Sequence, residues 1–111
     1  MNLLKKIAYL VTFTFLVASC SQDDEGVPLP LGAYENGFLI TNEGPFQNGS
    51  GTVSFVSDDY LFVENEIFNQ VNSSDLGNIV QSMGFNDDQA FIVVNNSNKI
   101  EVVNRYTFES I

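Results

Sequence analysis

Apolar residues in the last two thirds of the chain come in short bursts, which small and polar residues interrupt. From Tyr34 onward, no stretch keeps a helical period over the dozen or so residues that a helix prediction needs. Several bursts alternate instead, so that Val53, Phe55 and Ser57 share one face of a strand. The pattern predicts strands over residues 37–43, 52–57, 60–68, 79–85, 89–95 and 99–106.

Turn residues separate the predicted strands at short, regular intervals. The turns fall at residues 44–45, 48–51, 58–59, 86–88 and 96–98, which are rich in Gly, Asn, Asp and Ser. Residues 75–78 could begin a short helix, but Gly77 disfavours it and a loop is predicted. This spacing of strands and turns predicts an all-β fold, an antiparallel meander.

Two parts of the meander resemble each other. Residues 38–42 align with residues 91–95 at an offset of 53, and residues 53–57 align with residues 100–104 at an offset of 47. An offset near 50 lies close to the length of one four-stranded propeller blade, which is roughly 40–50 residues. With two copies, chance similarity between two hairpins explains the pattern equally well.

The first 19 residues have the organisation of a bacterial lipoprotein signal peptide. Lys5 and Lys6 precede a largely apolar run of eleven residues, 7–17, which suits a signal peptide and is too short for a transmembrane helix. The end of this segment, residues 16–20, resembles the lipobox, with Cys20 at the position that receives the lipid. An ordinary secretory signal followed by a free cysteine is the alternative. The prediction is cleavage before Cys20 and lipid attachment to its sulfur.

An acidic tether is predicted over residues 20–33, before the β domain at 34–111. Gln22, Asp23, Asp24 and Glu25 resemble the export signal of Bacteroidota surface lipoproteins, which implies the outer face of the outer membrane. A solvated acidic linker explains the same residues. The prolines at positions 28 and 30 disfavour helix, so the segment is expected to act as a spacer.

The charge and the missing residue types exclude several classes of function. The chain has 14 acidic and 4 basic side chains and a formal net charge of −10, which opposes binding to nucleic acid. Loss of Lys5 and Lys6 with the signal peptide changes this charge from −10 to −12. Without histidine there is no His-based triad and no imidazole metal site, and a single cysteine makes no internal disulfide.

Three segments together carry a resemblance to a known family. Residues 38–44, 76–83 and 91–103 resemble, in order and spacing, the opening of the Bacteroidota YncE-like surface β-propeller lipoproteins. The resemblance implies the first one to two blades of a propeller, about 1.5 to 2 within residues 34–111. It also implies a surface binding module, in some members beside a TonB-dependent transporter and in one branch specific for corrinoids. Since a propeller closes about 4–8 blades in a ring, the sequence is expected to be an N-terminal fragment of a longer protein.

The candidate ligand-binding residues follow two predicted strands. Asn42 and Glu43 end one strand, and Asn95 and Asn96 end the similar strand of the second copy. In a propeller such strand ends meet at the central channel, whereas the alternative assigns these residues to ordinary turns.

The remaining carboxylates are predicted to have no catalytic or metal-binding role. The aspartate pairs at residues 58–59 and 87–88 lack the spacing of a calcium loop and suit hairpin turns. Glu64 and Glu66 are predicted to share the solvated face of one strand. The sequence therefore predicts no catalytic residue, metal or cofactor.

These inferences predict a lipoprotein of the outer membrane, exposed at the cell surface, that binds a nutrient or a partner protein without catalysis. The expected partners are the membrane, through Cys20, a TonB-dependent transporter, and an unidentified small molecule or protein. A propeller-based enzyme, such as a lyase or a quinone-dependent oxidoreductase, is one alternative. An adhesion or structural protein of the cell envelope is the other.

Overall fold

The computed structural model describes residues 2–4 and 28–111. The predicted signal peptide apart from residues 2–4, the lipidation site Cys20 and the export signal Gln22, Asp23, Asp24 and Glu25 lie outside the described residues. Of the predicted tether, only residues 28–33 are described. Within the described ranges, no helix combines the length and the apolar character needed to cross a membrane.

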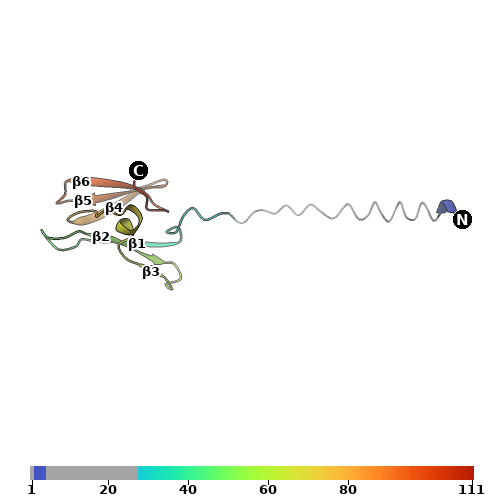
Figure 1. The fold of residues 1–111 in the computed structure, drawn as a ribbon, viewed down its shortest axis with the longest axis horizontal. Helices are drawn as coiled ribbons and strands as arrows, with labels where there is room; N and C mark the ends of the chain where they lie inside the picture. Colours follow the sequence, from blue (N-terminus) through green and yellow to red (C-terminus); the bar gives the residue numbers. More distant parts are fainter. Residues whose placement is uncertain (1, 5–27) are drawn as a thin grey trace.

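Two antiparallel three-stranded sheets form the domain, which confirms the all-β prediction (Figure 1). The first sheet has the order β1-β2-β3 and the second the order β4-β5-β6, with one short helix in the connection between them. The elements are β1 (Gly37–Asn42), β2 (Thr52–Ser57), β3 (Val63–Glu64), α2 (Ile67–Asn72), β4 (Val80–Asn86), β5 (Gln89–Val94) and β6 (Lys99–Asn104).

The hydrophobic core contains residues from both sheets and the helix. Every second residue of β5 is buried, as the period of two in a strand requires, and these residues share one core cluster with Val53 and Phe55 of β2. Each fully buried aliphatic or phenyl side chain contributes about 1.5–3 kcal/mol to stability. The complete cluster consists of Tyr34, Val53, Phe55, Ile67, Phe68, Leu76, Val80, Ala90, Ile92, Val94, Val103 and Phe108.

The strand pairing corrects the predicted alignment of the two copies by one residue. Leu39 of β1 pairs with Phe55, and Ile92 of β5 pairs with Glu101. The offset is therefore 53 between β1 and β5, as predicted, and 46 rather than 47 between β2 and β6. The predicted offset matches the buried Val53 with Ile100, which is 60% exposed. It is wrong because a shift of one residue moves a side chain to the opposite face of a strand.

The strand predicted over residues 60–68 is also wrong. It divides into the two-residue strand β3 and the helix α2, and Glu66 between them has a left-handed backbone, with φ 57° and ψ 34°. Ile67 and Phe68 are both buried, and two consecutive residues of one strand would point to opposite faces. Glu64 and Glu66 therefore do not share a strand face. The helix is only six residues long, too short for its period to be recognised in the sequence.

The predicted aspartate turns are confirmed in both sheets. Asp58 and Asp59 lie in the turn after β2, where Asp59 Oδ1 accepts hydrogen bonds from Ser57 Oγ at 2.6 Å and Leu61 N at 3.0 Å. These bonds, first the one from Ser57, lower the pKa of the Asp59 carboxyl. Asp87 and Asp88 form the two-residue loop between β4 and β5, in which Asp87 has φ 51°. Aspartate suits both places because it tolerates tight turn geometry.

Apolar side chains also lie on the face of each sheet that points away from the core. In the first sheet Phe38 and Ile40 of β1 and Val63 of β3 are exposed, and the Phe38 ring stacks on Tyr60 at 6.0 Å. In the second sheet the exposed Ile100 pairs with Val93 on the corresponding face. Each sheet thus has one face in the shared core and a second, partly apolar face in contact with solvent.

Candidate binding site

The four predicted ligand-binding residues lie at the same end of the domain. Asn42 is the last residue of β1, and the Glu43 carbonyl accepts a hydrogen bond from the Val80 N–H at 3.3 Å, where β4 begins. The Asn95 N–H, just after β5, donates to the Ile79 carbonyl at 2.9 Å. The start of β4 therefore lies between the ends of β1 and β5, and we call this end of the domain, formed by residues 42–52, 75–80 and 95–98, the loop end.

The side chains of two of the three predicted asparagines, Asn42 and Asn96, form hydrogen bonds within the fold. The Asn42 amide donates to Thr52 Oγ1 at 3.1 Å and to Ser54 Oγ at 3.0 Å, both on the neighbouring strand. The Asn96 amide donates to Asn78 Oδ1 at 3.0 Å. Glu43 and Asn95 connect their strand ends to the start of β4 through the backbone hydrogen bonds described above. The structure therefore brings the predicted residues to one end of the domain, and the amides of Asn42 and Asn96 each connect two segments.

Asn78, which the sequence did not single out as a site residue, connects the loops of the loop end. Its side-chain amide donates to the carbonyls of Pro45 at 2.6 Å and Gly49 at 3.2 Å. Its Oδ1 accepts from Gln47 N as well as from Asn96, and its backbone N–H donates to Ser97 Oγ at 3.0 Å. One residue thus joins the loop after β1 to the loop after β5.

Gly77 beside it allows the same loops to approach closely. Its N–H donates to Ser50 Oγ at 2.9 Å, and its carbonyl accepts from Gly51 N at 2.8 Å. Its φ is +107°, and a Cβ at this position would lie 2.5 Å from Ser97 Oγ. A side chain would therefore be both strained and in collision, which explains a glycine here.

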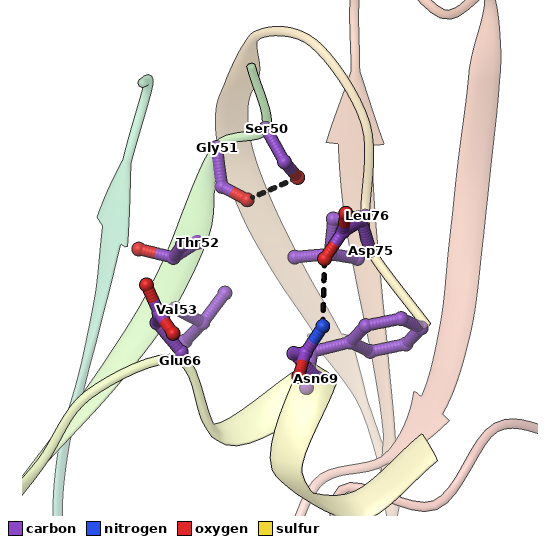
Figure 2. Close-up of a pocket in the computed structure, with 9 residues that line it drawn as sticks. Ser50, Gly51, Thr52, Val53, Glu66, Asn69, Asp75 and Leu76 are labelled. Atoms are coloured by element: carbon purple, nitrogen blue, oxygen red, sulfur yellow. Dashed lines mark hydrogen bonds between the residues drawn. The ribbon is translucent and has the colours of Figure 1, made fainter. Parts of the chain in front are cut away.

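A small cavity opens beside these loops, between the start of β2, the helix α2 and the segment before β4 (Figure 2). Its volume is about 180 Å³. Val53, Phe68 and Leu76 are buried core residues that line it. The complete lining is Ser50, Gly51, Thr52, Val53, Glu66, Phe68, Asn69, Asp75 and Leu76.

Two carboxylates are the charged groups of the cavity lining. Figure 2 shows Glu66 on the side of β2 and Asp75 on the other side, above Asn69. The Asn69 amide donates to Asp75 Oδ1 at 2.6 Å, which orients this carboxylate. None of the described residues donates a hydrogen bond to the Glu66 carboxylate or forms an ion pair with either carboxylate. The sequence analysis assigned neither residue to a binding site, because both lie near the cavity only as a result of the short helix, which was not predicted.

A second, shallower depression of about 280 Å³ lies at the end of the β5–β6 hairpin. It includes the predicted Asn95, together with Asn98 and Lys99. Lys99 Nζ forms an ion pair with Glu101 at 3.1 Å, and this lysine is 39% exposed. The depression is open to solvent, and its lining includes the buried Val94 beside the exposed Ile100.

Tyr34 is an ionisable residue of the hydrophobic core. Burial, and then the neighbouring Glu64 carboxylate, raise the pKa of Tyr34. The Tyr34 ring packs edge-on against Phe55 and Phe108, with centroids 5.3 and 5.9 Å away. Among residues 2–4 and 28–111, no three His, Cys, Asp or Glu side chains are grouped as a metal site would require.

Comparison with known proteins gives a family and no function. The model of a family described as "Domain of unknown function (DUF5074)" matches residues 36–111. The match includes all six strands, the helix α2 and the whole loop end. No curated protein matches the chain.

Proposed function

We propose, from the premise that the chain belongs to the DUF5074 family of domains of unknown function, that it is a non-catalytic binding protein anchored by a lipid on Cys20. In this proposal the lipid holds the protein in the outer membrane, and the domain faces the outside of the cell. The loop end binds a nutrient or a partner, and a TonB-dependent transporter in the same membrane receives what is bound.

The position of the single cysteine is the observation that carries the proposal. Cys20 follows directly after a basic start, an eleven-residue apolar run and the small residues Ala18 and Ser19. Each buried methylene of an attached lipid contributes about 0.8 kcal/mol to membrane binding, and two or more acyl chains give stable anchoring. The acidic residues Asp23, Asp24 and Glu25 support export to the outer face.

Two features support a propeller as the scaffold. The hairpins β1–β2 and β5–β6 are equivalent in register, and the sheets that contain them share one core. Each sheet also has apolar side chains on its outward face, Phe38 and Ile40 in one and Ile100 in the other. Stacked repeat units bury both faces of their sheets against neighbours in this way. We therefore infer that the two sheets are adjacent blades.

The loop end supports binding rather than catalysis. Asn78 and Gly77 connect the three segments of the loop end, and rigid loops bind with a smaller loss of entropy. The cavity carboxylates Glu66 and Asp75 lie on opposite sides of it, with no histidine or lysine in the lining to act with them as a nucleophile or base.

Replacement of the proposed lipid attachment residue tests the anchor. We expect Cys20→Ala to move the protein from the membrane fraction to the soluble or unprocessed fraction, because no thiol remains to accept the lipid. Ser21→Ala, one residue further, is the matched control and should remain in the membrane fraction. Quantitative immunoblotting of cell fractions measures both variants, and unchanged membrane association of Cys20→Ala would refute the proposal.

Protease treatment of intact cells tests the orientation. A protein on the outer face is digested while a periplasmic control protein survives. Protection of the domain until the outer membrane is permeabilised would contradict surface exposure.

A further inference from the structure

The turn between β2 and β3 exposes a continuous run of apolar side chains. Tyr60, Leu61, Phe62 and Val63 follow one another, and each has more than half of its surface in contact with solvent, up to 87% for Leu61. Single exposed apolar residues are ordinary on a protein surface, whereas a contiguous group of them marks a surface that contacts a partner or a membrane. We call residues 58–63 the apolar turn.

Hydrogen bonds hold the apolar turn in one conformation. The Tyr60 N–H donates to the Ser57 carbonyl at 2.9 Å, and the Leu61 N–H donates to Asp59 Oδ1 at 3.0 Å. The Ser57 N–H donates to the Phe62 carbonyl at 2.9 Å. These backbone groups have partners within the turn, so its apolar side chains enter a less polar environment without the loss of these hydrogen bonds. A turn that is already ordered also loses little entropy on binding.

The apolar turn lies where the chain enters the domain. Gly37, the first residue of β1, pairs with Ser57, the last residue of β2, and the Asp58 N–H donates to the Asn36 carbonyl at 3.2 Å. The loop end lies at the opposite end of these six-residue strands, about 20 Å away, since each residue of a strand rises about 3.3 Å. The segment that leads from the proposed lipid on Cys20 therefore reaches the domain beside the apolar turn.

The predicted tether keeps this end of the domain close to the membrane. An extended residue spans at most about 3.6 Å, so residues 20–33 reach at most about 50 Å from the lipid. Contact between the turn and the bilayer is then an intramolecular event with a high effective concentration. A small apolar surface is sufficient for such a contact, whereas a free protein would need a much larger one.

A basic residue and a further exposed aromatic ring lie at the same end of the domain. Arg105 directly follows β6, and the carbonyl of the next residue, Tyr106, accepts a hydrogen bond from the Tyr34 N–H at 2.9 Å. The Arg105 guanidinium lies 4.9 Å from the centre of the Phe85 ring, which is half exposed. A guanidinium binds the phosphate of a lipid headgroup, and aromatic rings favour the boundary between headgroups and acyl chains.

We propose that the apolar turn enters the surface of the membrane to which the protein is anchored. Leu61 and Phe62 contact the upper part of the acyl chains, and Tyr60 lies at the level of the headgroups, where its hydroxyl stays hydrated. The carboxylates of Asp58 and Asp59 repel anionic lipids, so the expected surface is zwitterionic. This inference rests on the proposed lipid anchor, and it directs the loop end away from the bilayer.

Single tryptophans test the contact, because the chain contains none of its own. The full lipidated protein is purified from membranes and inserted into phosphatidylcholine vesicles with brominated acyl chains, which quench a tryptophan that enters the bilayer. Leu61→Trp should lose most of its emission. Phe46→Trp, at an exposed apolar position of the loop end, is the matched control and should keep its emission. An unquenched Leu61→Trp, or equal quenching of the two variants, would overturn the proposal.

A charge placed in the apolar turn gives a second test. Tyr60→Trp reports from the turn itself and should be quenched, whereas Tyr60→Trp/Leu61→Glu should be quenched much less, because a carboxylate disfavours an apolar environment. Gln47→Glu adds the same charge at the loop end, so Tyr60→Trp/Gln47→Glu should stay quenched. The proposal fails if Leu61→Glu leaves the quenching unchanged.

Flotation of the same vesicles separates this inference from the proposed function. The lipid on Cys20 is expected to carry the wild type and every variant to the vesicle fraction. Flotation of an unquenched Leu61→Trp would overturn the contact of the apolar turn alone. A wild-type protein that does not float with the vesicles would overturn the lipid anchor, and with it both proposals.

Discussion

The two sheets contain the same hairpin but differ in what surrounds it. In the second sheet β4, β5 and β6 are joined by loops of two and four residues, and β5 alternates regularly between buried and partly exposed positions. In the first sheet nine residues separate β1 from β2, β3 has only two residues, and α2 follows. The cavity lies between the end of the first loop, the start of β2, the helix and the segment that follows the helix. The difference between the sheets therefore coincides with the candidate binding site.

The C-terminal segment pairs with the edge of the second sheet. Ser110 forms an isolated antiparallel bridge with Val103 of β6. Asn72 of α2 holds the same segment, because its amide donates to the Phe108 carbonyl at 2.9 Å and its Oδ1 accepts from Ser110 N. The helix that separates the sheets in sequence thus also joins them in space.

The largest expected difference in the free energy of unfolding is between substitutions at equivalent core positions of the two sheets. Ile92→Ala should lower the free energy of unfolding by about 2–5 kcal/mol, because Ile92 is fully buried in the shared core. Leu39, its counterpart at the offset of 53, is only half-buried, so Leu39→Ala should cost about half as much. Urea unfolding measures both. Equal losses would mean that the first sheet is as fully covered as the second, against the structure.

A smaller difference in stability is expected between two substitutions at the loop end. Asn78→Ala should reduce stability by about 2–3 kcal/mol, because it removes four exposed hydrogen bonds, with Pro45, Gly49, Gln47 and Asn96. Asn96→Ala removes one exposed bond and should cost about 0.5–1 kcal/mol. Thermal and urea unfolding measure the stability of both variants. If the two variants are equally stable, Asn78 does not connect the loops as described.

The smallest contrast concerns the aspartate turns and depends on pH. Because hydrogen bonds lower the pKa of Asp59 below its ordinary value of 3.8, its ionised form favours the folded state. This contribution is present above pH 3.8 and is lost as the pH falls through the lower pKa of the folded state. Asp59→Asn should therefore destabilise slightly at pH 6, and the difference from the wild type should disappear in strong acid.

Asp87→Asn provides the comparison from the second sheet. Asp87 has a positive φ, which asparagine tolerates equally, so this variant should match the wild type at both pH values. The urea midpoints of the two variants and the wild type, measured at pH 6 and in strong acid, test both expectations. If Asp59→Asn lowers stability equally at both pH values, its effect comes from turn geometry and not from the charge of Asp59.

Much of the fold could be predicted from the alternation of residues and the turn types. The hairpins at Asp58 and Asp87 and the all-β class followed from local rules, which need only neighbouring residues. The offset between β2 and β6 was wrong by one residue, because both faces of these strands contain apolar side chains. When neither face is clearly polar, the sequence pattern does not specify the register.

The candidate site was predictable only in part. The sequence placed Asn42 and Asn95 at equivalent strand ends, and the structure brings both to the loop end. Glu66, Asn69 and Asp75 could not be foreseen as neighbours, because tertiary contacts form the helix that positions them. Ile67 and Phe68 enter the shared core and stabilise this short segment, which its own length would not. Asn78 lay within a segment that carried the family resemblance, but its role needed the three loops in place.

The central claim, that a lipid on Cys20 holds this domain at a membrane, is tested most directly by mass spectrometry of the full protein isolated from cell membranes. We predict a chain that begins at Cys20, with a diacylglyceryl group on its sulfur and an acyl group on its amine. A protein recovered with residues 1–19 still attached, or with an unmodified Cys20, would contradict the account.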